Sequence, residues 1–276
     1  MILLKALLKE EIQQVLNLGV KVECNVIVGK SLDVEDLFDD GYEAVFIGSG
    51  AGLPRFMDIP GENFNGVYSS NEFLTRVNLM KAYDFPNNHT PVRIGNKVVV
   101  VGGGNVAMDA ARTAKRLGAD EVHIVYRRSM DELPARNEEI HHAVQEGIIF
   151  DLLVNPLEII GENSEVVSMK VIKMELGEPD ASGRRSPMPV EGSEWVMPVD
   201  TVIIAIGNTP NPLLTNTTSA LDTNRRGCIQ VEEATMATTM DNVYAGGDAV
   251  TGAATVILAM GAGKQAATSI KEKLLV

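Results

Sequence analysis

The feature that most restricts the fold of this chain is a strand, a glycine-rich turn and a helix in direct succession. Residues 97–101 are KVVVV, a short β-branched run typical of a parallel strand buried on both faces. The turn fits the pattern G-x-G-x-x-G/A and consists of Gly102, Gly103, Gly104, Asn105, Val106 and Ala107. Helical spacing over 105–117 and a second strand over 121–128 complete the order of a dinucleotide-binding βαβ unit.

Three positions of this turn need a small residue, each for a different physical reason. Gly102 makes the tight turn out of the strand, Gly104 lets the backbone approach a pyrophosphate, and Ala107 lets the helix pack against the strand. The free N–H groups and partial positive charge of a helix N-terminus favour bound phosphate. The turn therefore predicts a nucleotide site, and a glycine turn without a ligand is the alternative.

The end of the second strand indicates which nicotinamide cofactor binds. An NAD site places Asp or Glu there to hold the ribose hydroxyls, whereas this chain has Tyr126, Arg127 and Arg128. A guanidinium can donate two hydrogen bonds to a 2′-phosphate, which a carboxylate would repel. We therefore expect NADPH rather than NADH, with a solvated arginine pair as the alternative.

The rest of the chain alternates helical and strand patterns. Helices are expected over 3–18, 33–40, 69–83, 134–147 and 253–275, and further strands over 20–28, 43–50, 148–154, 156–161, 166–176 and 200–207. Segments 42–54 and 199–210 share a weak repeat in which an apolar strand ends at glycine with proline soon after. The pattern predicts an α/β fold with two related nucleotide-binding domains, the second inserted in the first.

Composition and charge remove several classes of function. The net charge of −13 argues against non-specific binding to nucleic acid or an anionic membrane. Cys24 and Cys228 are far apart, so no redox disulfide, zinc site or iron–sulfur ligand set is expected. Neither a signal peptide nor an apolar run of bilayer length is recognisable, and we expect a cytoplasmic protein. We predict no metal site and no catalytic side chain, because bound cofactors would carry the chemistry.

Four stretches together carry a family resemblance. They are GSGAGLPRFMDIPGENFNGVYSSNEFLTRVNLMKAY, VVVVGGGNVAMDAARTAKRLGA, IVYRRSMDELPARNEE and VYAGGDAVTGAATVILAMGAGKQAA. The chain resembles the small (beta) subunit of NADPH-dependent glutamate synthase, and equally the flavin subunits of NADP-linked ferredoxin oxidoreductases and sulfide dehydrogenases. The resemblance implies two interleaved Rossmann-like domains of the disulfide-reductase type, with parallel sheets and a small antiparallel β-meander. In this reading 91–207 is the NADPH domain, and 1–90 with 208–276 is a partial FAD-type domain.

The resemblance also implies an activity and a set of cofactor contacts. NADPH would pass a hydride to FAD, which would pass electrons to iron–sulfur clusters and a partner, such as a large glutamate synthase-type subunit or an iron–sulfur carrier. The NADPH contacts would be Gly102, Gly103, Gly104, Asn105, Val106, Ala107, Tyr126, Arg127, Arg128 and Gly207. The FAD contacts would be Gly246, Gly247, Asp248, Ala254, Thr255 and Val256, with Asp248 at a ribityl hydroxyl and the last three at the isoalloxazine O2/N1 edge.

The sequence also departs from the family. Members begin with a cysteine-rich iron–sulfur domain and a strand–GxGxxG–helix unit for the ADP half of FAD, and neither is recognisable here. We therefore expect a fragment or a shortened product, with an exposed apolar patch that favours a homodimer or aggregation. The alternatives are a related subunit with ferredoxin, sulfide or polysulfide as acceptor, and a non-catalytic NADPH-binding module that holds no flavin.

Overall fold

The computed structural model describes residues 2–179 and 183–275, and these form two compact units. Unit 1 consists of 1–50 and 211–276, and unit 2 consists of 51–210. The sequence led us to place the first boundary near residue 90. In the structure residues 51–90 cluster with 91–207, because the strand at 67–69 pairs with the strand at 201–204.

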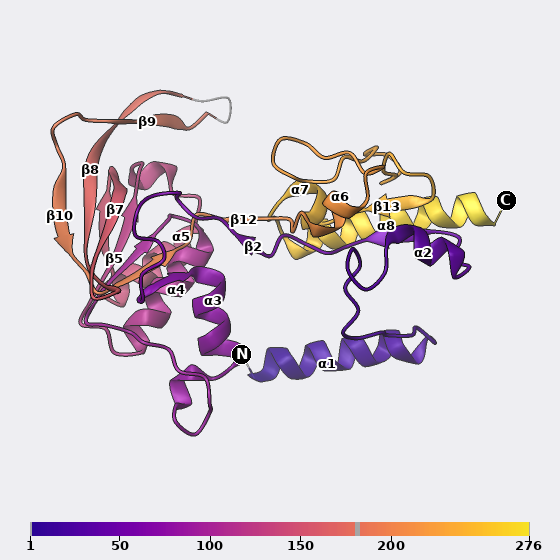
Figure 1. Cartoon of the computed structure of the whole chain (residues 1–276), viewed down its shortest axis with the longest axis horizontal. Coiled ribbons are helices and arrows are strands. Elements are labelled where there is room, and N and C mark those ends of the chain that lie inside the picture. The colour runs from indigo at the N-terminus through magenta and orange to yellow at the C-terminus, as the bar shows by residue number, and fades with distance from the viewer. Residues whose placement is uncertain (1, 180–182, 276) are drawn as a thin grey trace. The chain divides into compact units, whose positions relative to one another are not determined.

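Unit 2 is built on a five-stranded parallel sheet (Figure 1). In spatial order its strands are β3 (Val67–Ser69), β11 (Thr201–Ile204), β4 (Lys97–Val101), β5 (Glu121–Tyr126) and β6 (Ile149–Leu152). The valines of β4 are buried on both faces, as the sequence predicted for a central strand. All five strands end at the same edge of the sheet, where nucleotide-binding folds hold their ligands.

Helices cover one face of this sheet. They are α3 (Ser70–Leu74), which continues as the π-helical turn η1 (Thr75–Leu79) and the 3₁₀ turn η2 (Ala82–Asp84), then α4 (Asn105–Arg116), the 3₁₀ turn η3 (Met130–Glu132) and α5 (Asn137–Gln145). The small side chains of α4, including Ala107, Ala110, Ala111 and Ala114, pack against Val98 and Val100 of β4. Their small volume lets the helix lie close to the sheet, as the motif predicts.

An antiparallel sheet covers the other face (Figure 1). It consists of β7 (Val154–Glu162), β8 (Glu165–Pro179), β9 (Arg185–Pro189) and β10 (Trp195–Pro198), with β8 paired to all three others. Val99 and Val101 of β4 share a buried cluster with Ile159 and Met169 of this sheet. The α/β class, with parallel strands and a small antiparallel sheet, is confirmed.

Two short strands lie where the chain enters and leaves unit 2. They are β2 (Leu53–Pro54) and β12 (Asn208–Thr209), which pair antiparallel. The Arg55 N–H donates to the Gly207 carbonyl at 3.0 Å and extends this pairing by one bond.

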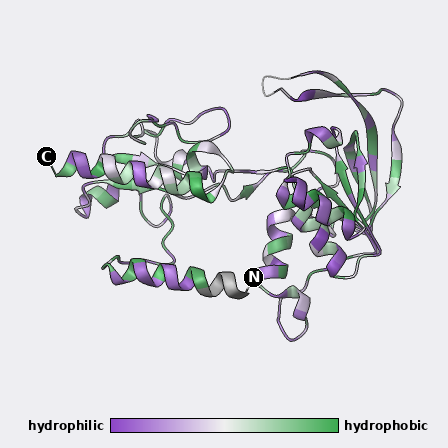
Figure 2. Cartoon of the chain, turned by 180° about the vertical axis from the view of Figure 1, so that it is seen from behind, coloured by the Kyte–Doolittle hydropathy of each residue, from purple (hydrophilic) through white to green (hydrophobic). Residues whose placement is uncertain are grey.

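Unit 1 has less regular structure. Its elements are α1 (Ile2–Asn17), α2 (Val34–Asp39), β1 (Val45–Ile47), α6 (Leu213–Thr217), β13 (Val243–Ala245), α7 (Asp248–Thr251) and α8 (Val256–Leu274). Within the described residues β1 pairs only with β13, in parallel, and a small cluster around Ile47 and Val243 forms the core. The first turn of α8 is apolar (Figure 2), and its Val256 and Ile257 are 78% and 77% exposed.

Most predicted helices and strands are confirmed, but the strand predicted over 20–28 is wrong. That segment is irregular, with one isolated bridge between Val28 and Leu32. Alternating β-branched residues favour a strand only where a neighbouring strand completes the ladder, and no described strand pairs with 20–27. Among the helices that the structure describes, none has the length and apolarity needed to span a bilayer.

Candidate functional site

The glycine turn between β4 and α4 is closed by protein at two glycines and open at the third. Gly102 has φ +140°, and an added Cβ would lie 2.2 Å from the Ala205 carbonyl oxygen. A Cβ at Gly103 would lie 2.6 Å from Cδ2 of Leu133. A Cβ at Gly104 would meet no protein atom within 4 Å. The space beside Gly104 is therefore accessible to a ligand that needs close contact with the backbone.

The N-terminus of α4 faces this open space. Gly104 is its N-cap residue, and no side chain caps the helix. The side chain of Asn105 is engaged by the protein, since its Oδ1 accepts a hydrogen bond from the Arg136 N–H at 2.9 Å. Ala107 is fully buried, whereas Val106 is exposed. An uncapped helix start beside an open glycine is the arrangement that binds phosphate groups in nucleotide-binding folds.

The two predicted phosphate-binding arginines lie in different environments at the end of β5. Arg127 is exposed, whereas Arg128 is only 7% exposed and its Nε donates to the Arg185 carbonyl at 2.8 Å. Tyr126 is buried, and its hydroxyl donates to the Glu132 carbonyl at 2.8 Å. Arg127 is therefore the member of the pair that is open to a ligand.

Glu132 is a buried carboxylate beside these residues. It accepts hydrogen bonds from the Ser129 N–H and hydroxyl, and an ion pair joins it to Arg185 at 2.7 Å. The hydrogen bond from Ser129, with the contribution of Arg185, holds the pKa of Glu132 below its usual value. The carboxylate is therefore charged in the folded protein at neutral pH.

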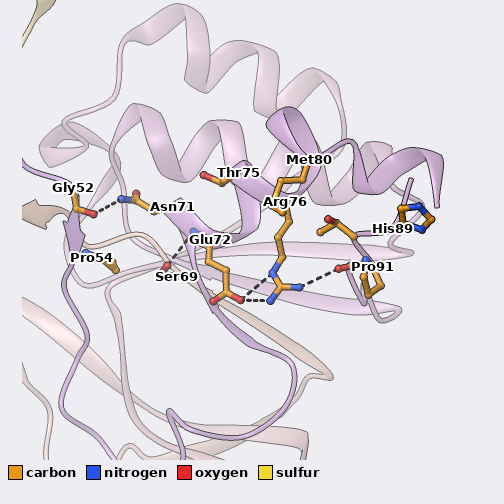
Figure 3. Close-up of a pocket in the computed structure, with 11 residues that line it drawn as sticks. Gly52, Pro54, Ser69, Asn71, Glu72, Thr75, Arg76, Met80, His89 and Pro91 are labelled. Atoms are coloured by element: carbon orange, nitrogen blue, oxygen red, sulfur yellow. Dashed lines mark hydrogen bonds and ion pairs between the residues drawn. The ribbon is translucent and has the colours of Figure 1, made fainter. Parts of the chain in front are cut away.

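A pocket that the sequence analysis did not predict opens at the end of β3. Its volume is about 720 Å³, and it is lined by Gly52, Pro54, Ser69, Asn71, Glu72, Thr75, Arg76, Met80, His89, Thr90 and Pro91. In Figure 3 the Arg76 side chain extends from the Glu72 carboxylate to the Pro91 carbonyl, with an ion pair of 2.9 Å to Glu72. The residues all come from 52–91, which carries no nucleotide motif, and β3 places them at the edge where the strands of the sheet end.

Side-chain amides connect this pocket to the end of β11. Asn71 donates to the Gly52 carbonyl at 3.1 Å and accepts from the Asn208 amide at 3.3 Å. Gly207, predicted as a cofactor contact, is exposed there with φ +105°, and an added Cβ would meet nothing within 4 Å. The pocket, Gly207 and the glycine turn thus follow β3, β11 and β4, three neighbouring strands.

Unit 1 contains the second predicted glycine turn, between β13 and α7. A Cβ at Gly246 would lie 2.9 Å from the Ala262 Cβ, and one at Gly247, where φ is +66°, would lie 3.2 Å from the Ala259 Cβ. Asp248 accepts a hydrogen bond from the Ala254 N–H at 3.2 Å. The two glycines let α8 pack closely against the end of β13.

The start of α8 is open to solvent. Ala254, Thr255 and Val256 are all exposed, and Thr255 is an N-cap residue whose side chain makes no capping hydrogen bond. The first turn of this helix therefore presents backbone N–H groups without a side-chain acceptor. An electron-rich ligand edge could accept hydrogen bonds from them.

Known proteins match nearly the whole chain. A family model described as pyridine nucleotide-disulphide oxidoreductase matches residues 5–268. The chain is 41% identical to the NADP(+)-dependent formate dehydrogenase subunit beta of Moorella thermoacetica, over 97% of this chain and 37% of the relative. It is 37% identical to the glutamate synthase [NADPH] small chain of Halomonas elongata, over 93% of this chain and 55% of the relative. The chain thus spans between about a third and about half of the length of these relatives.

A solved structure shows the same fold. The FprA protein of Mycobacterium tuberculosis, in complex with NADPH, matches with a TM-score of 0.73 and 22% identity, over 90% of this chain and 67% of that one. The likeness confirms the predicted two-domain Rossmann-like architecture. The predicted resemblance to glutamate synthase small subunits is confirmed by the curated relatives, which include several of these chains.

Proposed function

The chain belongs to the pyridine nucleotide-disulphide oxidoreductase family, and from this premise we propose that it is the NADPH-oxidising part of a flavin-dependent electron-transfer subunit. The observation that carries the proposal is the turn at Gly102–Gly104. Protein atoms exclude a side chain at the first two glycines, and only the third borders open space before the uncapped start of α4. A pyrophosphate fits this arrangement because it needs both backbone proximity and unpaired N–H groups.

The order of the strands gives NADPH a direction along the sheet edge. With the pyrophosphate at the end of β4, the adenosine half lies toward β5, where the exposed Arg127 can bind the 2′-phosphate. The nicotinamide half then lies over β11 and toward β3, beside Gly207 and the pocket in Figure 3. Asn71 and Asn208 are polar groups suited to orient that half.

Unit 1 supplies contacts for the flavin. FAD would supply the hydride-accepting chemistry for NADPH oxidation, and Gly246, Gly247, Asp248 and the start of α8 would hold it. The Cβ sides of Gly246 and Gly247 pack on α8, and the backbone of the half-buried Gly247 would approach the ribityl-phosphate arm, with Asp248 as acceptor for a ribityl hydroxyl. The open start of α8 favours the negative charge that reduced flavin carries near N1.

The proposal stops at the nicotinamide cofactor, which the names of the relatives share. The names differ in the second substrate, with glutamate synthase, formate dehydrogenase and an NADPH–Fe(3+) oxidoreductase among them. We take the immediate acceptor to be a partner subunit or domain with iron–sulfur clusters. We also place the protein in the cytoplasm, where the exposed thiol of Cys24 would stay reduced.

The first experiment measures NADPH binding by the full chain with calorimetry. Gly104→Ala should raise the dissociation constant for NADPH by about tenfold or more, because the methyl group occupies the space of the pyrophosphate. Gly263→Ala is the matched control, since it adds a methyl group in open space within α8. A wild-type chain that does not bind NADPH would overturn the proposal.

The second experiment tests the flavin step separately. The chain is incubated with FAD, freed of unbound flavin, and assayed for NADPH-dependent reduction of a dye. A yellow protein that reduces the dye supports the catalytic reading. A chain that binds NADPH but stays colourless would overturn the catalytic interpretation. The protein would then be a non-catalytic NADPH-binding module.

A further inference from the structure

The segment that follows β5 packs directly on the glycine turn. We call residues 127–136 the β5 loop. Its Ala135 N–H donates to the Gly103 carbonyl at 3.2 Å, and its Arg136 N–H donates to Asn105 Oδ1. Leu133 fills the space that a side chain at Gly103 would need. Residues 133–136 of the loop are therefore anchored on the turn by contacts that do not involve Arg185.

Two groups of the β5 loop hold the same residue of β9. Arg128 donates from Nε to the main-chain carbonyl of Arg185, and Glu132 binds the Arg185 side chain through Nε at 2.7 Å. β9 belongs to the antiparallel sheet (Figure 1), and the two bonds to Arg185 connect that sheet to the β5 loop. The partners are 57 and 53 residues apart in the sequence. We call this arrangement the Arg185 clamp.

The burial of Arg128 and Glu132 makes the Arg185 clamp a strong constraint on the backbone of the β5 loop. Arg128 and Glu132 are 7% and 8% exposed, and buried charges are costly unless they are paired. Glu132 is also fixed by Ser129 through its backbone N–H and hydroxyl, and the carbonyl of Arg128 accepts from the Leu153 N–H at 3.1 Å. The backbone on the carboxyl side of Arg127 is thus held at several points.

The clamp bears on Arg127, which the proposed function assigns to the 2′-phosphate. Of the two arginines that follow β5, Arg128 is buried and Arg127 is exposed, so Arg127 is the one that a ligand can reach. A guanidinium that is pre-positioned loses less entropy when it binds a phosphate. Loss of the contacts to Arg185 would loosen residues 128–132 beside Arg127, while residues 133–136 keep their contacts with the turn, so the ligand that carries the 2′-phosphate would be weakened most.

We propose that Arg128, Glu132 and Arg185 are positioning residues that set the preference for NADPH over NADH by holding Arg127 at the 2′-phosphate. The inference rests on the proposed function and assigns the second arginine of the pair a structural task. NADH shares every other contact with NADPH, so the ratio of the two affinities isolates the effect on the 2′-phosphate.

The test compares dissociation constants of the full chain for NADPH and NADH. Arg185→Gln should weaken NADPH binding about tenfold and change NADH binding less than about twofold. Arg185→Lys should retain most of the preference, because it keeps a cation near Glu132 and leaves the carbonyl for Arg128. Arg226→Gln, an exposed arginine of unit 1, is the matched control for loss of charge.

Glu132→Gln gives an independent variant, with the same expected loss of NADPH preference. Should it fail to fold, Arg185→Gln carries the test, because the Arg185 side chain is 45% exposed. Equal weakening of NADPH and NADH, or no change in either, would overturn the inference. A wild-type chain that binds neither nucleotide overturns the proposed function instead.

Discussion

The two glycine turns of this chain are similar in sequence context but differ in the structure that surrounds them. The turn after β4 lies at the end of a central strand in a five-stranded sheet whose two faces are both covered. The turn after β13 lies at the end of a two-stranded sheet, and the helix that follows starts with exposed Val256 and Ile257. The first turn is packed against protein at Gly102 and Gly103 and open at Gly104, whereas the second is fixed mainly by α8.

This difference teaches that a glycine pattern indicates where a nucleotide could bind, while the surrounding sheet decides how rigid the site is. A rigid site needs side chains and loops that hold its backbone. Unit 2 has such contacts in the β5 loop and the Ala205 carbonyl. In unit 1 we find the close packing of Gly246 and Gly247 on α8.

The largest expected effect comes from filling each turn with a methyl group. Gly102→Ala should destabilise unit 2 by about 4 kcal/mol, because a positive φ and a backbone collision add together. Gly247→Ala should cost about 1–2 kcal/mol, since its Cβ only crowds the Ala259 methyl group. Urea unfolding monitored by the fluorescence of Trp195, the only tryptophan, reports on unit 2, and circular dichroism reports on both units. Equal losses of unfolding free energy in Gly102→Ala and Gly247→Ala would show that the two turns are held equally tightly.

A pair of identical substitutions sharpens the comparison at the level of packing. Ile203 of β11 is fully buried, whereas Ile257 of α8 is 77% exposed. Ile203→Ala should lower the free energy of unfolding of unit 2 by about 3 kcal/mol. Ile257→Ala should change stability by less than about 0.5 kcal/mol. A large loss from Ile257→Ala would mean that another surface covers the start of α8 in solution, which sedimentation would detect as association.

The smallest expected effect is a pH dependence confined to unit 2. Every ion pair among the described residues lies in that unit, including the one between His123 and Asp151 at 2.7 Å. The hydrogen bond to Asp151, with a contribution from Glu121, raises the pKa of His123 above 6.5. The stabilisation is therefore complete below about pH 6.5 and is lost as the pH rises through the raised pKa.

The expected loss is under about 1 kcal/mol, because the pair is partly exposed to solvent. His123→Gln should abolish this dependence in the Trp195 unfolding curve. His142→Gln, an exposed histidine of α5, serves as the control and should leave it in place. Unit 1 should show no matching change between pH 6 and pH 8. If the pH dependence of stability persists in the His123→Gln variant, a group other than His123 causes it.

Local sequence was enough to predict the centre of unit 2. The β-branched run of β4 and the small residues of α4 act through neighbours in the chain, so periodicity and the glycine pattern identify them. The strand predicted over 20–28 was wrong because its alternation says nothing about whether a partner strand lies beside it. The pocket at the end of β3 was missed because its lining residues, all from 52–91, fit no nucleotide-binding pattern.

In the candidate site, too, local sequence predicted only part of the arrangement. The sequence placed both Arg127 and Arg128 at the 2′-phosphate, and that assignment remains a prediction. Both residues follow the last residue of β5, where strand periodicity no longer applies, so the sequence could not show that only Arg127 is exposed. The bonds from Arg128 and Glu132 to Arg185 join segments more than fifty residues apart, so no local pattern could reveal them.

The pairing of β2 with β12 has a consequence for how such a chain could arise. Leu53 lies opposite Thr209 and Pro54 opposite Asn208, so the two ends of unit 2, which spans 51–210, lie side by side. A segment whose two ends meet can be spliced into a surface loop of a host without stretching either partner. Unit 2 thus has the form of an inserted domain. A single recombination event could move the whole nucleotide-binding domain into another protein.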